Sequence, residues 1–179
     1  MGEHRDDEAT AEAAQPLDRL CDEILERHHA YAHIAVPRIR GQLAEALERE
    51  PAAVPVALPA LFAALADRLL SHLAKEENIL FPALAALAEA DRTGRGRPPL
   101  PFPTLLHPIR VMEAEHARLA DALDELTAVA HDFTAPAEAS EATRRLMAEL
   151  SGFRDHLAAH LTVENDVLFP RALDLDRRL

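Results

Sequence analysis

Apolar residues recur along this chain at the three- and four-residue spacing of an α-helix, in four separate stretches. The helices that this spacing predicts cover about residues 17–50, 59–90, 103–131 and 136–175. Pro37 and Pro82 lie inside the first two stretches, and the apolar pattern resumes beyond each of them. We therefore expect these prolines to bend their helices rather than end them.

Each predicted helix presents one apolar stripe. The expected core positions are His29, Val36, Leu43 and Leu47 in the first helix; Leu61, Leu65, His72, Ile79 and Ala83 in the second; Ile109, Met112, His116, Leu119 and Leu123 in the third; and Leu146, Phe153, His160, Glu164 and Val167 in the fourth. Four helices of similar length with short or proline-rich connections predict an all-α fold, an antiparallel up-down four-helix bundle. We expect residues 16–179 to form it, preceded by a disordered acidic N-terminal tail at residues 1–15.

The composition supports this fold and removes several classes of function. The chain has no Trp, one Tyr and five Gly, and it is dominated by helix-forming residues. Its net charge of −12 and its lack of a basic patch argue against nucleic acid as a partner. The longest apolar run, residues 52–66, is too short for a membrane span and contains two prolines. With a lone Cys21 and no secretory signal, we expect a cytoplasmic protein.

One twelve-residue pattern occurs twice. Residues 71–82 read SHLAKEENILFP and residues 159–170 read AHLTVENDVLFP. In both copies a Glu follows a His by four residues, which places the imidazole and the carboxylate on one face of a helix. Both groups ligate transition metals, and a carboxylate can bridge two ions.

The four predicted stripes each contain one histidine, and two of them add a glutamate. A bundle interior does not bury four imidazoles and two carboxylates without compensation, and two metal ions would supply it. The candidate metal ligands are His29, His72, Glu76, His116, His160 and Glu164. Two bridging glutamates and two histidines per ion leave room for an oxo or hydroxo bridge and one open position. Mixed imidazole and carboxylate ligation favours two Fe ions, with Mn as the main rival, whereas structural zinc sites are closed and usually rich in Cys.

This series of residues, with Leu-Phe-Pro after both His/Glu pairs, resembles the hemerythrin-like (HHE cation-binding) proteins, which are four-helix bundles holding a non-haem di-iron centre. The resemblance covers about residues 17–175. The local sequences HHAYAHIAVP (28–37), KEENILFP (75–82), HPIRVMEAEH (107–116) and VENDVLFPRAL (163–173) are most similar to a bacterial branch implicated in repairing damaged iron–sulfur clusters. The resemblance implies that the four histidines are terminal ligands and the two glutamates are bridges. The sequence lacks the N-terminal Cys-bearing domain of that branch.

The third helix departs from the oxygen-carrying hemerythrins, which hold two histidines four residues apart there. This chain has Met112 and Ala120 at the positions flanking His116. We therefore expect the open iron position to react with O₂, H₂O₂ or NO rather than carry O₂ reversibly. The alternatives are iron–sulfur cluster repair or iron donation, and a non-enzymatic O₂ or NO sensor or carrier. Whether the protein is a di-iron oxidoreductase that turns over peroxide or NO stays open, and its electron donor is unknown.

A few further residues are candidates for the same site. His33 and His156 each lie one turn from a predicted ligand and are either additional ligands or outer hydrogen-bond partners. The phenol of Tyr31 either packs in the core or reaches a bound ligand. Glu48 and Glu50 lie near the place where the cluster-repair proteins have a further histidine.

Overall fold

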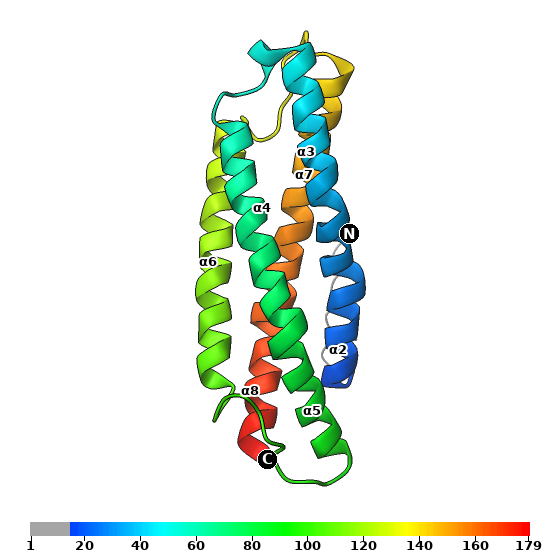
Figure 1. Ribbon diagram of the computed structural model, residues 1–179, viewed down its shortest axis with the longest axis vertical. Coiled ribbons are helices and arrows are strands. Elements are labelled where there is room, and N and C mark those ends of the chain that lie inside the picture. The colour runs from blue at the N-terminus through cyan, green and yellow to red at the C-terminus, as the bar shows by residue number, and fades with distance from the viewer. Residues whose placement is uncertain (1–14) are drawn as a thin grey trace.

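The computed structural model describes residues 15–179, so the tail predicted at the N-terminus lies almost wholly outside the described residues. Within residues 15–179 the chain is all-α and forms four long helices that run alternately up and down (Figure 1). Helix one consists of α2 (Leu17–Ile24), η1 (Leu25–His29) and α3 (Ala30–Arg49); helix two of α4 (Leu58–Lys75), η3 (Glu76–Leu80) and α5 (Phe81–Arg92); helix three of α6 (Leu106–Val129); helix four of α7 (Glu141–Val163), η4 (Glu164–Leu168) and α8 (Phe169–Arg178). A short 3₁₀ turn, η2 (Pro51–Ala53), follows helix one.

The four helices form a closed ring around one long axis. The most extensive packing joins α3 to α7 and α4 to α6, and further contacts join α3 to α4 and α6 to α7. At the lower end in Figure 1, α2 packs on α5 and α5 on α8. The predicted antiparallel four-helix bundle is therefore confirmed. None of the helices in the described part of the chain combines the length and the hydropathy that a membrane span requires.

Helix four begins later than its apolar pattern predicts, at Glu141 rather than near Pro136. The Ser140 side chain caps it by accepting a hydrogen bond from the Thr143 amide. Glu50 accepts a second bond, from the Ser140 amide, at 2.8 Å. The preceding turn holds His131, Asp132 and Phe133 at positive φ, which ends helix three. Pro37 lies inside α3 and does not end it, as predicted.

The bundle interior is divided into two apolar cores. The upper core, at the top of Figure 1, contains the edge-to-face pair Phe62 and Phe153, with ring centroids 5.7 Å apart. The lower core contains Phe81 and Phe169 together with the buried residues of α2, α5 and α8. The buried His and Glu side chains lie between the two cores and form the layer that we call the polar layer: His29, His72, Glu76, His116, His160 and Glu164.

Three of the four helices contain one π turn, and each π turn includes a residue of the polar layer. In η3 the Phe81 amide donates to the Glu76 carbonyl, five residues back, and in η4 the Phe169 amide donates in the same way to the Glu164 carbonyl. In η1 the Ala30 amide donates to the Leu25 carbonyl. Turns of this kind insert one residue into an α-helix and are frequent at functional sites.

The π turns explain two of the errors in the predicted core. Ile79 is 50 % exposed and the next residue, Leu80, is buried, because the inserted residue moves the stripe one position along the chain. Val167 is likewise only half-buried while Leu168 is fully buried. Leu47 is also outside the core, where Ala46 takes its place.

Candidate metal centre

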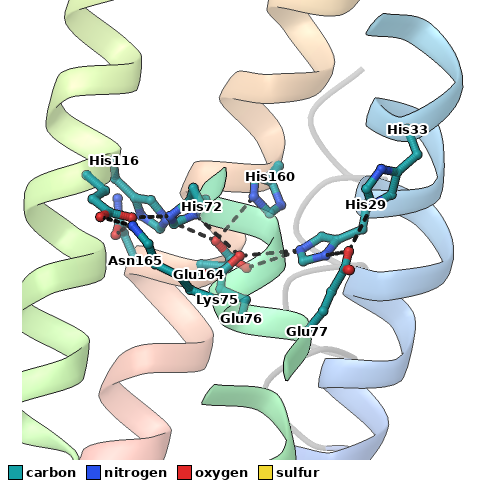
Figure 2. Close-up of polar contacts among 11 residues, drawn as sticks. His29, His33, His72, Lys75, Glu76, Glu77, His116, His160, Glu164 and Asn165 are labelled. Carbon is teal, nitrogen blue, oxygen red and sulfur yellow. Dashed lines mark hydrogen bonds and ion pairs between the residues drawn. The ribbon is translucent and has the colours of Figure 1, made fainter. Parts of the chain in front are cut away.

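The six predicted ligands meet in the polar layer, at the middle of the bundle (Figure 2). Each is at most 3 % exposed, and the two glutamates are completely buried. All four helices contribute: one histidine comes from each of them, and the glutamates come from η3 and η4. The four-residue spacing of the repeated pattern places each Glu one turn after its His, as the sequence predicts.

Their ligand atoms form two groups, each able to hold one metal ion. One consists of His29, Glu76, His160 and Glu164, and the other of His72, Glu76, His116 and Glu164. Within each group the ligand atoms lie within 4.8 Å of one another. Both glutamates belong to both groups, whereas each histidine belongs to one.

The distances place each carboxylate between two imidazoles from different helices. Glu76 Oε2 lies 3.4 Å from His29 Nε2 and 3.3 Å from His72 Nε2. Glu164 Oε2 lies 3.2 Å from His116 Nε2 and 3.4 Å from His160 Nε2. The Nε2 atoms of all four histidines therefore point at the glutamates, and their Nδ1 atoms face outward.

Three of the four Nδ1 atoms meet an oxygen acceptor on a neighbouring helix. Glu77 accepts from His29 at 3.0 Å and Glu115 accepts from His72 at 3.1 Å. The Asn165 amide oxygen accepts from His116 at 2.8 Å. These bonds place the ring proton on Nδ1 and leave the Nε2 lone pair directed into the polar layer, which is the tautomer that a metal ligand needs.

The donor set fits a bound cation and is poorly satisfied without one. The Nε2 atoms of His72 and His116 lie 3.0 Å apart, and with both ring protons on Nδ1 two lone pairs face each other across that gap. Among the described residues, both oxygens of Glu76 and of Glu164 and the Nε2 atoms of His29 and His160 are buried without a hydrogen-bond partner. Buried polar atoms are normally paired, so this concentration of unpaired acceptors calls for a cation.

Burial alone would keep these side chains uncharged. It raises the pKa of Glu76 to about 8, with the charge of Glu164 as the next cause, and raises the pKa of Glu164 well above its usual range. Burial also lowers the pKa of His72 to about 4 and that of His160 well below its usual range. A cation would reverse the effect on the glutamates, because its charge favours the carboxylate form.

The two carboxylates that accept hydrogen bonds from the histidines, Glu77 and Glu115, remain ionised. Burial raises the pKa of Glu77, but hydrogen bonds from His33 and His29 outweigh it and the net shift is downward. For Glu115, burial is outweighed in the same way by bonds from Lys75 and His72. Both carboxylates can therefore accept hydrogen bonds from the Nδ1–H groups, and their negative charge can compensate positive charge in the polar layer.

The residues that the sequence left open lie outside both groups. His33 donates to Glu77 and is an outer partner, with 48 % of its side chain exposed. His156 donates to the Arg27 carbonyl at 3.1 Å and stacks on Tyr31, with centroids 3.8 Å apart. Glu50 accepts a hydrogen bond from the amide of Ser140, the residue that caps helix four, and Glu48 lies on the surface.

Sequence reasoning missed the three outer acceptors Glu77, Glu115 and Asn165. Each directly precedes or follows a predicted ligand in the chain, and each bonds a histidine on the neighbouring helix rather than its own neighbour. Their spacing alone would assign them to the solvent-facing side. A polar residue adjacent to a ligand is the only available signal, and it does not indicate the partner.

A helical bundle with two overlapping groups of buried His and Glu residues defines a metal-binding protein of the four-helix class. Comparison with known families agrees. Residues 20–172 match the hemerythrin HHE cation-binding domain, and the chain belongs to that family.

The chain is similar to bacterial proteins named iron–sulfur cluster repair protein YtfE. The relative from Musicola paradisiaca is 33 % identical over 162 residues, which cover 89 % of this chain and 67 % of the relative. Those from Salmonella paratyphi B and Salmonella newport are 32 % identical over 162 residues, covering 89 % of this chain and 68 % of each relative. About a third of each relative therefore has no counterpart in the aligned region.

Proposed function

We propose that this chain is a non-haem di-iron protein whose two ions occupy the polar layer and react with a small ligand, O₂, H₂O₂ or NO. The observation that carries the proposal is the pair of ligand groups that share Glu76 and Glu164. In it, Glu76 and Glu164 would be shared by both ions, His29 and His160 would hold one ion, and His72 and His116 would hold the other. Four protein ligands per ion leave positions free for an exogenous ligand.

Iron is favoured over other metals by the donor set. Two imidazoles and two carboxylates per position, with no thiolate in either group, match the nitrogen and oxygen ligation that suits iron. Manganese is the alternative with similar preferences. A bound iron pair would supply redox electrons and an open coordination position.

The protein residues have separate tasks in this proposal. The two cores above and below the polar layer exclude bulk water from it. Glu76 and Glu164 supply negative charge at the centre. Three of the histidines, His29, His72 and His116, hold a proton at Nδ1, and their N–H groups donate hydrogen bonds to Glu77, Glu115 and Asn165. The outer bonds thereby fix the orientation of three imidazole rings.

A second candidate function is iron–sulfur cluster repair, in which bound iron is donated to a damaged cluster. The relatives named as cluster repair proteins favour it. In that case the iron is cargo as well as cofactor, and the ligands must release it. The two candidates share one metal site and differ in whether a small ligand or the iron itself is turned over.

Metal analysis of the purified protein tests the premise that both candidate functions share, namely that the polar layer binds iron. We expect about two irons per chain and an absorption band of an oxygen-bridged ferric pair. Glu76→Ala and Glu164→Ala should each lose most of the iron, because both ion positions lose a ligand, whereas Glu125→Ala, on the exposed face of α6, should keep it. Full iron content in both variants would show that the bridging assignment is wrong.

Two kinetic measurements separate the candidates. Rapid mixing of the ferrous protein with NO or with H₂O₂ should give repeated turnover if ligand reaction is the function. Incubation with a protein carrying a damaged cluster should restore that cluster at the expense of bound iron if repair is the function. Stoichiometric binding without either result would favour a sensor or carrier.

A further inference from the structure

The outer hydrogen bonds of the polar layer follow one direction around the bundle. Helix two provides Glu77 for His29 on helix one, and helix four provides Asn165 for His116 on helix three (Figure 2). Helix three provides Glu115 for His72 on helix two. The fourth bond of this ring would run from helix one to His160 on helix four. Instead, His160 Nδ1 is buried without a hydrogen-bond partner among the described residues.

The position of the missing partner follows from the other three. Each outer acceptor is a direct chain neighbour of a ligand: Glu115, for example, precedes His116 and bonds His72. The corresponding residue of helix one is His28, which precedes His29. Its ring lies beside that of His160, with centroids 5.5 Å apart.

Two further observations join His28 to His160. His28 Nδ1 is also buried without a partner within residues 15–179, so two unpaired ring nitrogens occur in neighbouring side chains. Both rings line one small cavity of about 10 Å³, whose other walls include Phe153 and Leu157. That volume is close to the smallest that holds a single water molecule.

Resting on the metal centre proposed above, we propose that His28 is the positioning residue for His160. His160 binds its ion through Nε2 and donates its Nδ1 proton towards His28 Nδ1, either directly after a small ring rotation or through one water in the cavity. A neutral imidazole is a suitable acceptor for this proton. His28 thereby completes the ring of cross-helix bonds that Glu77, Glu115 and Asn165 begin.

The consequence is confined to one ion position. His160 belongs only to the group with His29, so loss of its outer partner should loosen that position and leave the His72 and His116 position intact. Loss of an outer partner typically lowers metal affinity by about 10- to 100-fold. We therefore expect about half of the bound iron to be released about 10- to 100-fold faster.

The test compares two replacements of His28 in the full chain loaded anaerobically with Fe²⁺. His28→Phe keeps a ring against His160 but removes the acceptor, whereas His28→Asn keeps an acceptor close to the place of Nδ1. Iron release to an excess of a coloured ferrous chelator is then followed in time. The faster phase should occur in His28→Phe and be largely absent from His28→Asn. If Phe disturbs folding, His28→Asn against His28→Ala gives the same comparison.

Matched variants assign the phases. Asn165→Leu removes the acceptor of His116 and should accelerate release of the other half of the iron, while His107→Phe, at an exposed histidine, should change neither half. Wild-type release rates in His28→Phe, or acceleration of the same half by His28→Phe and Asn165→Leu, would overturn the role of His28. Wild-type protein that binds no iron would instead contradict the metal centre itself.

Discussion

At the scale of single residues, the polar layer buries two carboxyl groups that no hydrogen-bond donor among the described residues satisfies. Glu76 and Glu164 are fully buried, and their four oxygens have no hydrogen-bond partner there. An ionised carboxylate in that position costs several kcal/mol unless a cation compensates it. The metal-free protein must therefore either keep the glutamates protonated or lose stability.

This requirement predicts a pH dependence of the metal-free protein. Glu76 has a pKa of about 8 in the fold against 4.5 for a free side chain, so the unfolded chain loses the proton first. The contribution of protonated Glu76 to the free energy of unfolding is fully present below pH 4.5 and is lost as the pH rises through about 8. Above pH 6.5, His72 is mostly neutral in both the folded and the unfolded chain. The change in melting temperature between pH 6.5 and 8 should therefore report mainly the loss of protons from the glutamates.

We expect the metal-free protein to melt at progressively lower temperature from pH 6.5 to 8, and the iron-loaded protein to show little change. The gain in melting temperature on iron loading should therefore grow with pH. Glu76→Gln is the matched control, since an amide has no proton to lose; it should reduce the metal-free slope and leave the part that Glu164 contributes. A metal-free wild-type protein with constant melting temperature over this range would contradict the electrostatic account.

The candidate ligands could be predicted from the sequence because each is a polar residue at a core position of an apolar stripe. His29, His72, His116 and His160 are predicted to lie at such positions, and the structure buries all four. Their assignment as metal ligands stays a prediction until metal is measured. The outer residues could not be predicted, because a bond such as that from His72 to Glu115 depends on how two helices meet.

At the scale of elements, helices one, two and four differ from regular α-helices because each contains one π turn. η3 begins at Glu76 and η4 at Glu164, and each is followed by a proline at the second position of the next helix. A proline has no amide to donate, so it is tolerated where the ladder of backbone bonds changes register. The twice-repeated Leu-Phe-Pro is thus the sequence signal of η3 and η4, whereas η1 has no such motif. A stripe calculated at about 100° per residue takes no account of the residue that a π turn inserts. This is the reason that the apolar pattern predicts Ile79, and not Leu80, in the core.

Deletion of Ile79 tests the role of this turn. Removing an exposed residue from the five-residue turn should convert η3 into a regular α turn and keep the apolar stripes of α4 and α5 aligned. Helicity by circular dichroism should be retained. Iron affinity should fall by about tenfold or more, because the carboxylate of Glu76 is no longer presented from a widened turn.

Deletion of Glu125 is the control for that experiment. It is an exposed residue of α6, which contains no π turn, so its removal rotates every later position of the helix by about 100° and takes Leu126 out of the core. This variant should be strongly destabilised. Unchanged iron affinity after deletion of Ile79 would show that the π turn has no part in the site.

At the scale of the whole molecule, two apolar cores lie on either side of the polar layer, whose buried glutamate oxygens have no hydrogen-bond partner among the described residues. The upper core reaches from the top of the bundle to Leu73 and Leu161, and the lower core continues from Leu80 and Leu168. Bound metal would connect the two by bringing all four helices together at the polar layer. Its effect on stability should therefore be global.

The expected size of that effect can be stated. Iron at 100 times its dissociation constant adds about 2.7 kcal/mol per ion. For a domain of this size each kcal/mol raises the melting temperature by about 2–4 °C, so one ion should contribute about 5–10 °C. Calorimetry of the metal-free and iron-loaded protein measures this, with Glu164→Ala as the variant that should not respond. Iron binding without any rise would mean that the unfolded chain binds iron as tightly as the folded one, which would contradict a site that exists only in the folded bundle.

The way the ligands divide between the two halves of the chain has a consequence for its origin. Helices one and two form one hairpin and helices three and four another, and each of the two ligand groups takes one His and one Glu from each hairpin. A solitary hairpin would offer half of each coordination shell, so an ancestor of that length would have needed a second copy of itself to capture metal. The repeated His-x-x-x-Glu pattern is what fusion of two such copies into one gene would leave behind.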